Sequence, residues 1–285
     1  TDFDPGVGVF NLVGSGGSDI FIRKLDSLAN FVWAKKLAGT SGDFANSITI
    51  DSMENVYVTG YFNGTADFNP GSSSYFLSAI NTDIFICKLD SLGNFIWAKN
   101  FGAGAVDIGY SITVDANQNV FTTGTFQSTV DFDPSIAVYN LSSSGGTDIF
   151  ISKLDYLGEF IWAKKIGGTG NDFGTFVFID NASNVYTTGY YKNTTDFDPG
   201  VGIYNLTSVV GSDDIFISKL DSSGTFKWAK TIGWIDPEMG NSISVDQMGN
   251  VFSTGIFRGT VDFDPGTGVF NMTSAGPVGS DIYIS

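Results

Sequence analysis

An acidic phrase, Asp-Phe-Asp-Pro-Gly, occurs five times with small variations and places oxygen ligands beside a tight turn. Carboxylates one residue apart, followed by a turn glycine, suit Ca²⁺, which accepts about six to eight oxygen ligands. Ca²⁺ is therefore a candidate structural ligand. The candidate ligands in these loops are Asp2, Asp4, Asp67, Asn69, Asp131, Asp133, Asp196, Asp198, Asp262 and Asp264.

The same phrase is also a turn signal without any metal. Asp readily accepts hydrogen bonds from nearby backbone N–H groups, and Pro-Gly is a frequent turn pair. The phrase lacks the third acid and the distal Glu of an EF-hand loop, so a single copy is a weak metal motif. Two interpretations stay open: a repeated structural turn, or such a turn tightened by Ca²⁺.

The spacing of the phrase shows that the chain is an internal repeat. Its first Asp recurs at 2, 67, 131, 196 and 262, a period of 64–66 residues. Each unit holds four short β-rich runs, and turns such as Asp26–Asn30 and Asp51–Asn55 join them in hairpins. The sequence thus predicts an all-β fold, a β-propeller of four-stranded antiparallel blades, as a segment of a longer repeat protein. The expected blades are 1–40 (partial), 41–104, 105–168, 169–233 and 234–285 (partial).

Two positions in each unit carry further structural expectations. Known blade repeats run about 40 to 50 residues, so the unit has an excess, and the acidic phrase lies in this insertion, from Asn63 to Thr82 in the first complete copy. Four tryptophans hold one position in the last strand, where identical spacing favours packing of blade against blade over ligand stacking. They are Trp33, Trp97, Trp162 and Trp228.

The strands "NVYVTG", "DIFISKLD" and "NFIWAK" resemble the bacterial β-propeller repeat of the SBBP type, and the resemblance covers essentially the whole chain. This resemblance implies a large secreted or cell-surface protein of Gram-negative bacteria, many of which use type IX secretion. The acidic insertion is not part of the family's minimal pattern. The resemblance implies little about biochemical activity, because a fold does not name a function.

The acids follow the repeat, and they dominate the charge. Lys and Arg number 14 against 30 Asp and Glu, so nucleic acid is not expected as a partner. Strand order places the insertion loop, the start of the third strand and the loop between units on one face, with about four carboxylates close together per unit. The second set of candidate calcium ligands is Asp19, Asp43, Asp83, Asp107, Asp148, Asp172, Asp214, Glu238 and Asp281.

The opposite face carries Asp-Ser turns. Ser27, Ser52 and Ser91 follow an Asp and precede Leu or Met, which resembles the short acceptor for O-glycans in bacteria with type IX secretion. Turns favour Asp-Ser in any case, so the pattern is weak. The longest apolar runs stop after a few residues, and membrane insertion is not expected.

Catalysis is not expected either. The chain has no His and one Cys, which excludes a Ser-His-Asp triad and the usual zinc sites. The favoured function is a non-catalytic extracellular scaffold or adhesion module that contacts other surface proteins, copies of itself or extracellular glycans. The alternative is a calcium-dependent glycan-binding propeller, and a polysaccharide-active enzyme is a remote third. Aromatics that could face sugar, or form an extra packing strand, are Phe10, Tyr75, Phe76, Tyr139, Tyr204 and Phe270.

Overall fold

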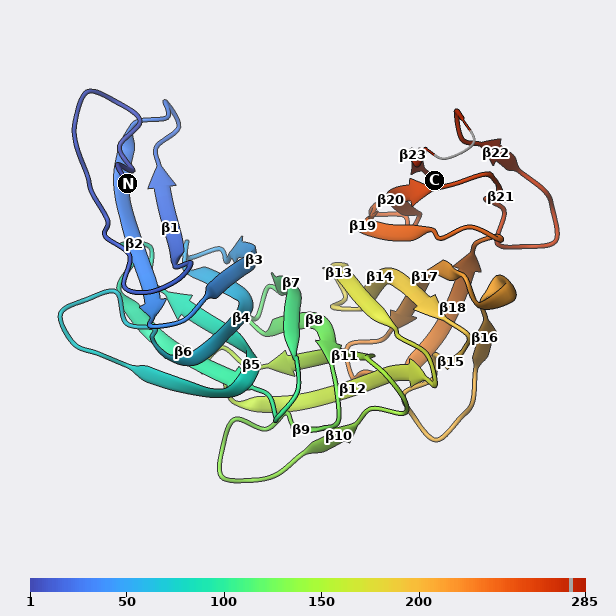
Figure 1. The fold of residues 1–285 in the computed structure, drawn as a ribbon, viewed down its shortest axis with the longest axis horizontal. Helices are drawn as coiled ribbons and strands as arrows, with labels where there is room; N and C mark the ends of the chain where they lie inside the picture. Colours follow the sequence, from blue (N-terminus) through green and yellow to red (C-terminus); the bar gives the residue numbers. More distant parts are fainter. Residues whose placement is uncertain (277–278) are drawn as a thin grey trace.

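The computed structural model describes residues 1–276 and 279–285 and confirms an all-β, antiparallel protein. The units follow one another along an open arc, with the two chain ends on its two arms (Figure 1). The strands are β1 (Ile20–Leu25), β2 (Phe31–Gly39), β3 (Asp43–Ile50), β4 (Val56–Asp67), β5 (Phe76–Leu89), β6 (Phe95–Phe101), β7 (Ile108–Val114), β8 (Val120–Phe126), β9 (Thr129–Asp131), β10 (Asn140–Ser142), β11 (Asp148–Leu154), β12 (Phe160–Gly168), β13 (Phe173–Ile179), β14 (Val185–Lys192), β15 (Thr194–Asp196), β16 (Asn205–Thr207), β17 (Asp213–Leu220), β18 (Phe226–Ile232), β19 (Met239–Val245), β20 (Val251–Phe257), β21 (Thr260–Asp262), β22 (Asn271–Thr273) and β23 (Asp281–Ile284). One short 3₁₀ turn, η1 (Val209–Gly211), precedes β17.

Each complete unit folds as an up-and-down sheet. In the fourth unit (169–233) the strand order is β13-β14-β17-β18, and the third unit (105–168) repeats it as β7-β8-β11-β12. The insertion adds a small hairpin, β15–β16 in the fourth unit. In the second unit (41–104) the two strands of the insertion continue the adjacent strands of the sheet, so that β4 and β5 are long. The partial first (1–40) and fifth (234–285) units flank these three.

Each hairpin turn is stabilised by an Asp whose carboxylate accepts hydrogen bonds from the backbone of the turn. Some of these acids, such as Asp115, are buried, and others, such as Asp26, are exposed. Asp115 Oδ1 accepts hydrogen bonds from the N–H groups of Asn117 (2.9 Å) and Asn119 (2.8 Å), and its Oδ2 accepts from the Asn119 amide (2.8 Å). Similar bonds lower the pKa of Asp26, where the Asn30 side chain and backbone donate to the carboxylate. These acids are therefore structural parts of the turns.

The interface between two neighbouring units is here called a junction, and the four junctions are numbered along the chain. A repeated contact joins the units at the first three. At the second junction the Trp97 indole N–H donates to the Tyr156 carbonyl of the next unit (3.2 Å), and the Lys88 ammonium donates to the same oxygen (3.1 Å). Trp33 with Lys24, and Trp162 with Lys153, repeat this at the first and third junctions, on the carbonyls of Ser91 and Ser222. The expected packing of unit against unit is confirmed for Trp33, Trp97 and Trp162, whereas Trp228 packs on Tyr186 of its own unit.

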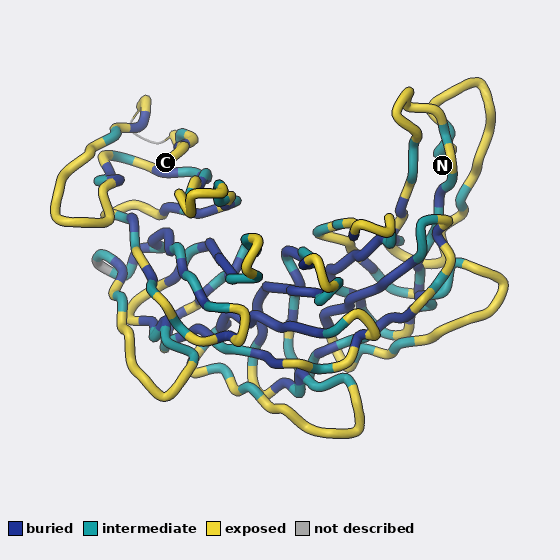
Figure 2. Tube along the Cα trace, turned by 180° about the vertical axis from the view of Figure 1, so that it is seen from behind, coloured by how far each residue is buried: buried dark blue, intermediate teal, exposed yellow. Residues whose placement is uncertain are grey.

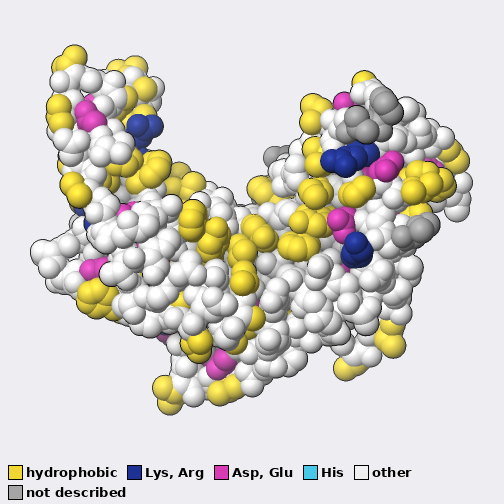
Figure 3. Space-filling model, in the orientation of Figure 1, with side chains coloured by type: hydrophobic (Ala, Val, Ile, Leu, Met, Phe, Trp, Pro, Cys, Tyr) yellow, Lys and Arg dark blue, Asp and Glu magenta, His cyan; other side chains and the backbone are white. Residues whose placement is uncertain are grey.

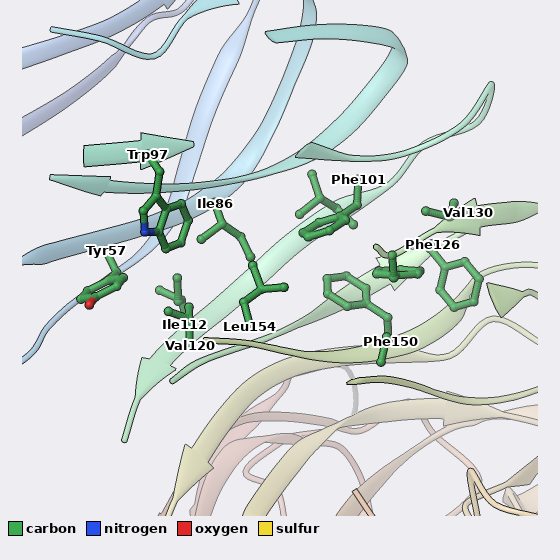
Figure 4. Close-up of a cluster of buried hydrophobic side chains, with 13 residues drawn as sticks. Tyr57, Ile86, Trp97, Phe101, Ile112, Val120, Phe126, Val130, Phe150 and Leu154 are labelled. Atoms are coloured by element: carbon green, nitrogen blue, oxygen red, sulfur yellow. The ribbon is translucent and has the colours of Figure 1, made fainter. Parts of the chain in front are cut away.

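Apolar side chains fill the space behind each junction. Around Trp97, the cluster combines Tyr57 and Ile86 of the second unit with Ile112 and Leu154 of the third (Figure 4). The core thus continues across the unit boundary, which is the way repeat proteins bury enough apolar surface. Figure 2 shows the burial pattern: buried strands run through the arc, and exposed loops project from its rim.

We expect Trp97→Phe to weaken the second junction. The aromatic packing would remain, but the Tyr156 carbonyl would lose its indole donor, which costs about 1 kcal/mol of unfolding free energy. Trp97→Ala should cost more, about 3 to 5 kcal/mol, because it also leaves a cavity. Urea unfolding measures both effects.

Trp234→Phe is the matched control, because the Trp234 side chain is 48% exposed. Its urea midpoint should stay at the wild-type value. An equal loss in the control and in Trp97→Phe would show that the junction bond contributes nothing specific.

Candidate functional site

The five acidic phrases form one repeated loop structure. In the third unit, Asp131 Oδ1 accepts from the N–H groups of Asp133 (3.0 Å) and Tyr139 (2.8 Å), and Asp133 Oδ1 accepts from Ser135 N–H (2.9 Å). Asp67 and Asn69 make the same set in the second unit, with Asn69 Oδ1 accepting from Gly71 N–H. The first acid therefore closes the loop and the second closes the turn within it.

The aromatic residue of the phrase anchors the insertion in the core. Phe132 is fully buried and packs edge-to-face on Phe126 (ring centroids 5.5 Å) and against Phe150 (5.1 Å). Phe68 and Phe197 occupy the equivalent positions. The strand that ends in the first acid also pairs with the preceding unit, as Asp196 does with Gly167 and Asp67 with Ala38. The phrase is thus a staple that fixes the insertion to its own unit and, at two junctions, to the unit before.

The expected sugar-facing aromatics are largely used in packing. Tyr139 lies against Phe160 (4.8 Å), and Tyr75 against Phe95, Tyr204 against Phe226 and Phe10 against Phe31 follow the same geometry. Phe76 and Phe270 are the most exposed, at 65% and 64%, and the four packed rings are also exposed, at 37–40%. The interpretation as a packing strand next to the insertion is supported for the four packed rings.

Calcium in the acidic phrases therefore stays a prediction with a specific difficulty. The Oδ1 atoms of both acids already accept backbone N–H groups, and an ion at these atoms would repel the donors. Only the outer Oδ2 atoms are left, on exposed or half-buried side chains.

The second set of acids behaves differently and is brought together in pairs at the junctions. One member starts the third strand of a unit, and the other starts the next unit. A backbone bond holds them adjacent: Asp107 N–H donates to the carbonyl of Thr82 (2.9 Å), the residue before Asp83. The four pairs are Asp19 with Asp43, Asp83 with Asp107, Asp148 with Asp172, and Asp214 with Glu238. Asp281 lies apart from these pairs and accepts from Ala275 N–H.

All paired carboxylates except the half-buried Asp19 are buried, and each pair has at least one oxygen without a hydrogen-bond partner among the described residues. Asp83, Asp148 and Asp214 are at most 2% exposed, and in each the Oδ1 atom has no hydrogen-bond partner. Glycine at the end of the preceding strand makes room for them: a Cβ on Gly167 would lie 2.2 Å from the Asp148 carboxyl carbon. A buried carboxylate oxygen without a donor is costly, so each pair must gain compensation from a proton, an ion or water.

Burial and the neighbouring acid raise the pKa values of these groups. Loss of hydration raises the pKa of Asp107 and of Asp172 to about 6, and the charges of Asp83 and Asp148 add to the respective shifts. At the fourth junction the pKa of Asp214 is raised to about 7 and that of Glu238 to about 8, again mainly by burial.

The expectation of about four carboxylates together in every unit is not met. Within residues 1–276 and 279–285, no group of three or more His, Cys, Asp or Glu side chains is placed to hold a metal. The reason is that the acidic phrase turns its carboxylates into its own loop, away from the junction pairs. Sequence reasoning named both sets of acids but ranked the phrase first, although the junction pairs are the buried ones.

The Asp-Ser turns lie as expected at hairpin tips. Ser27 and Ser52 are exposed, whereas Ser91 is half-buried and its carbonyl accepts the Trp33 and Lys24 donors. Glycosylation of these three residues stays a prediction.

Comparison with known proteins agrees with the repeat architecture. Residues 32–69 match the SBBP β-propeller repeat model. The chain is 30% identical over 270 residues to the "Uncharacterized WD repeat-containing protein L264" of Acanthamoeba polyphaga mimivirus, over 80% of this chain and 19% of that protein. It is 23% identical over 193 residues to the "Regulatory protein FlaEY" of Caulobacter vibrioides, over 68% of this chain and 19% of the relative. The chain thus spans about a fifth of each of these relatives.

In the part of the chain that the structure describes, no helix has the length and apolar character needed to cross a membrane.

The loop staple gives a direct prediction. Asp131→Ala removes the acceptor of two backbone N–H groups and should lower the unfolding free energy by about 1 to 2 kcal/mol. Asp133→Asn keeps an oxygen at the turn, as Asn69 does naturally, and should leave stability nearly unchanged. Thermal unfolding in the presence of a chelator measures both. Equal losses in the two variants would contradict the assignment of the Asp131 oxygen as the loop acceptor.

The raised pKa values predict that stability falls as pH rises. Asp107 and Asp172 hold protons in the folded protein up to about pH 6 but titrate near their ordinary range when unfolded. The folded state therefore binds more protons between the ordinary Asp pKa of 3.8 and about 6, and the urea midpoint should drop from about pH 4 to about pH 7. Asp83→Asn removes the like charge beside Asp107 and should make the drop smaller; an unchanged drop would contradict the coupling.

Proposed function

We propose that this chain is part of a non-catalytic extracellular or cell-surface scaffold built of β-propeller blades. Each four-strand unit would be one blade, and its loops would contact other surface proteins or further copies of the protein. The observation that carries this proposal is the junction: the same Trp and Lys donors meet the same turn carbonyl three times in succession. A contact that is repeated from unit to unit allows further units to be added in the same way, as a scaffold requires.

The distribution of polar groups supports the proposal. An active site needs unlike groups gathered in one place, whereas most acids of this chain recur at equivalent positions from unit to unit. Location outside the cell rests on the resemblance to SBBP repeats in secreted and surface proteins. The arc of Figure 1 is compatible with an array that continues beyond the segment or closes with further blades.

Calcium-dependent glycan binding is a weaker candidate. Its aromatic platform would need free ring faces, and four of the six expected rings pack on a neighbouring aromatic side chain.

The test of function is a glycan array with the purified chain, in Ca²⁺ and in chelator, together with a turnover assay on a panel of polysaccharides. The scaffold proposal expects no glycan hit and no product. A calcium-dependent hit would replace it with the lectin alternative, and a released oligosaccharide would replace it with an enzyme.

If the units are equivalent, removal of one whole unit should leave a protein that still folds. Excision of residues 105–168 should leave a folded protein, because Trp97 would then meet the turn at Ser222 in place of Tyr156. Excision of 105–136 removes half a unit and should prevent cooperative folding, since strand β11 would lose its partner β8. Circular dichroism and thermal unfolding compare the two deletions. Failure of both to fold would contradict the interchangeability of the units.

A further inference from the structure

The fourth junction differs from the third in charge and from the second in hydrogen bonding, where the Asn100 amide donates to Asp83. At the third junction the Lys165 ammonium lies 3.5 Å from an oxygen of Asp148 and supplies a positive charge beside the acid pair. In the fourth unit the equivalent position is Thr231, since Thr231 stands opposite Phe216 as Lys165 stands opposite Phe150. Thr231 accepts a hydrogen bond from the Tyr191 hydroxyl (2.9 Å) and brings no charge.

The same junction also gains acids. Asp213 precedes Asp214 where the third unit has Thr147, and Asp236 of the fifth unit lies in the loop where the fourth unit has Gly170. Lys192 stands opposite Asp213 across the strands, and Arg258 lines the same hollow as Asp236. Both basic residues are exposed, and within the described residues neither forms an ion pair with these acids. Figure 3 shows basic and acidic side chains beside one another on the arm that carries the fifth unit.

Two unpartnered oxygens point to a ligand at this place. Asp214 is 1% and Glu238 0% exposed, and Asp214 Oδ1 and Glu238 Oε1 have no hydrogen-bond partner. Their other oxygens accept the backbone N–H groups of Val209 (3.1 Å) and Trp234 (3.0 Å), which fixes both carboxylates in place. The remaining oxygens are therefore held in place, buried and without a donor from the described residues, beside a neighbouring acid.

We propose that the fourth junction binds one divalent cation, Ca²⁺ for preference, between Asp214 and Glu238. Carboxylate oxygens are the ligands of hard cations, and Ca²⁺ tolerates irregular geometry, so water can complete the shell around two protein carboxylates. Few protein ligands imply modest affinity, with a Kd of about 10⁻⁴ to 10⁻³ M, as in extracellular calcium modules. The ion would supply the positive charge that Lys165 brings to the Oδ2 side of Asp148 at the third junction, but at the unpartnered oxygens of the pair. This inference does not depend on the proposed scaffold function.

The experiment is thermal unfolding of the whole chain after chelator treatment, with Ca²⁺ or Mg²⁺ added back, and calorimetric titration of Ca²⁺ at pH 7.5. The wild-type melting temperature should rise by a few degrees at Ca²⁺ well above the Kd, and less with Mg²⁺. Glu238→Gln should melt higher than wild type in chelator, because repulsion is gone, and should show no calcium response and no binding heat.

The sharper variant copies the third unit into the fourth. Tyr191→Phe with Thr231→Lys recreates the Phe126 and Lys165 combination and places an ammonium beside Asp214. It should stabilise the chelated protein and abolish calcium binding. Asp264→Asn, in the acidic phrase of the fifth unit, is the control and should keep the full wild-type response.

Other outcomes overturn the proposal. A shared proton in the pair would give no calcium heat at any pH and a melting temperature that falls from pH 6 to pH 9 in wild type but not in Glu238→Gln. A calcium response that survives in Glu238→Gln and is lost in Asp264→Asn would place the ion in the acidic phrase. Unchanged melting under all conditions would leave water as the partner of the two oxygens.

Discussion

The contact between a tryptophan and the turn of the next unit sets the geometry on which the rest of this structure depends. The indole N–H and a lysine ammonium converge on one carbonyl, so the position of each unit is fixed by two donors on a single acceptor. The lysine lies over an aromatic ring of its own sheet, 5.0 Å from the Tyr57 centroid in the second unit, which adds a cation–π attraction and limits its freedom. Where this contact holds, the starts of neighbouring strands are brought together on the opposite edge.

The acid pairs lie where the starts of neighbouring strands meet, at the three junctions with the tryptophan contact and also at the fourth. Neither member of a pair is unusual by itself, since each accepts a backbone N–H at the start of a strand. They become strained only because the junction brings two strand starts side by side. The four pairs show different local solutions: Lys165 approaches Asp148, the Asn100 amide donates to Asp83 (3.2 Å), and Thr231 offers neither charge nor donor to Asp214. The residue at this one strand position (Asn100, Lys165 or Thr231) thus changes the hydrogen bonding and charge beside the acid pair from one unit to the next.

Many features of the fold could be predicted from the sequence, because the residues that form them recur at a fixed period. The hairpin turns, the inter-unit tryptophans and the location of the insertion all follow from residue types that recur at the same offset. The binding partner of the carboxylates in the acidic phrase could not be predicted. An Asp that binds a metal and an Asp that accepts a backbone N–H group look the same in the sequence. The pairing of Asp83 with Asp107 depends on how one unit packs against the next. The repeat period alone does not determine this packing. The importance of Thr231 appears only when the strand register is known.

The contacts between units join successive neighbours, so a pull on the two ends of the arc passes through all four junctions in series. The weakest of them then decides the force at which the chain begins to lengthen, however firm the other three are. Aromatic packing and the paired donors resist separation in a similar way at the first three. The last junction gathers the most acids, and its two paired carboxylates accept only backbone N–H groups. Whether their charge is neutralised therefore sets how readily the arc lengthens at that end under load.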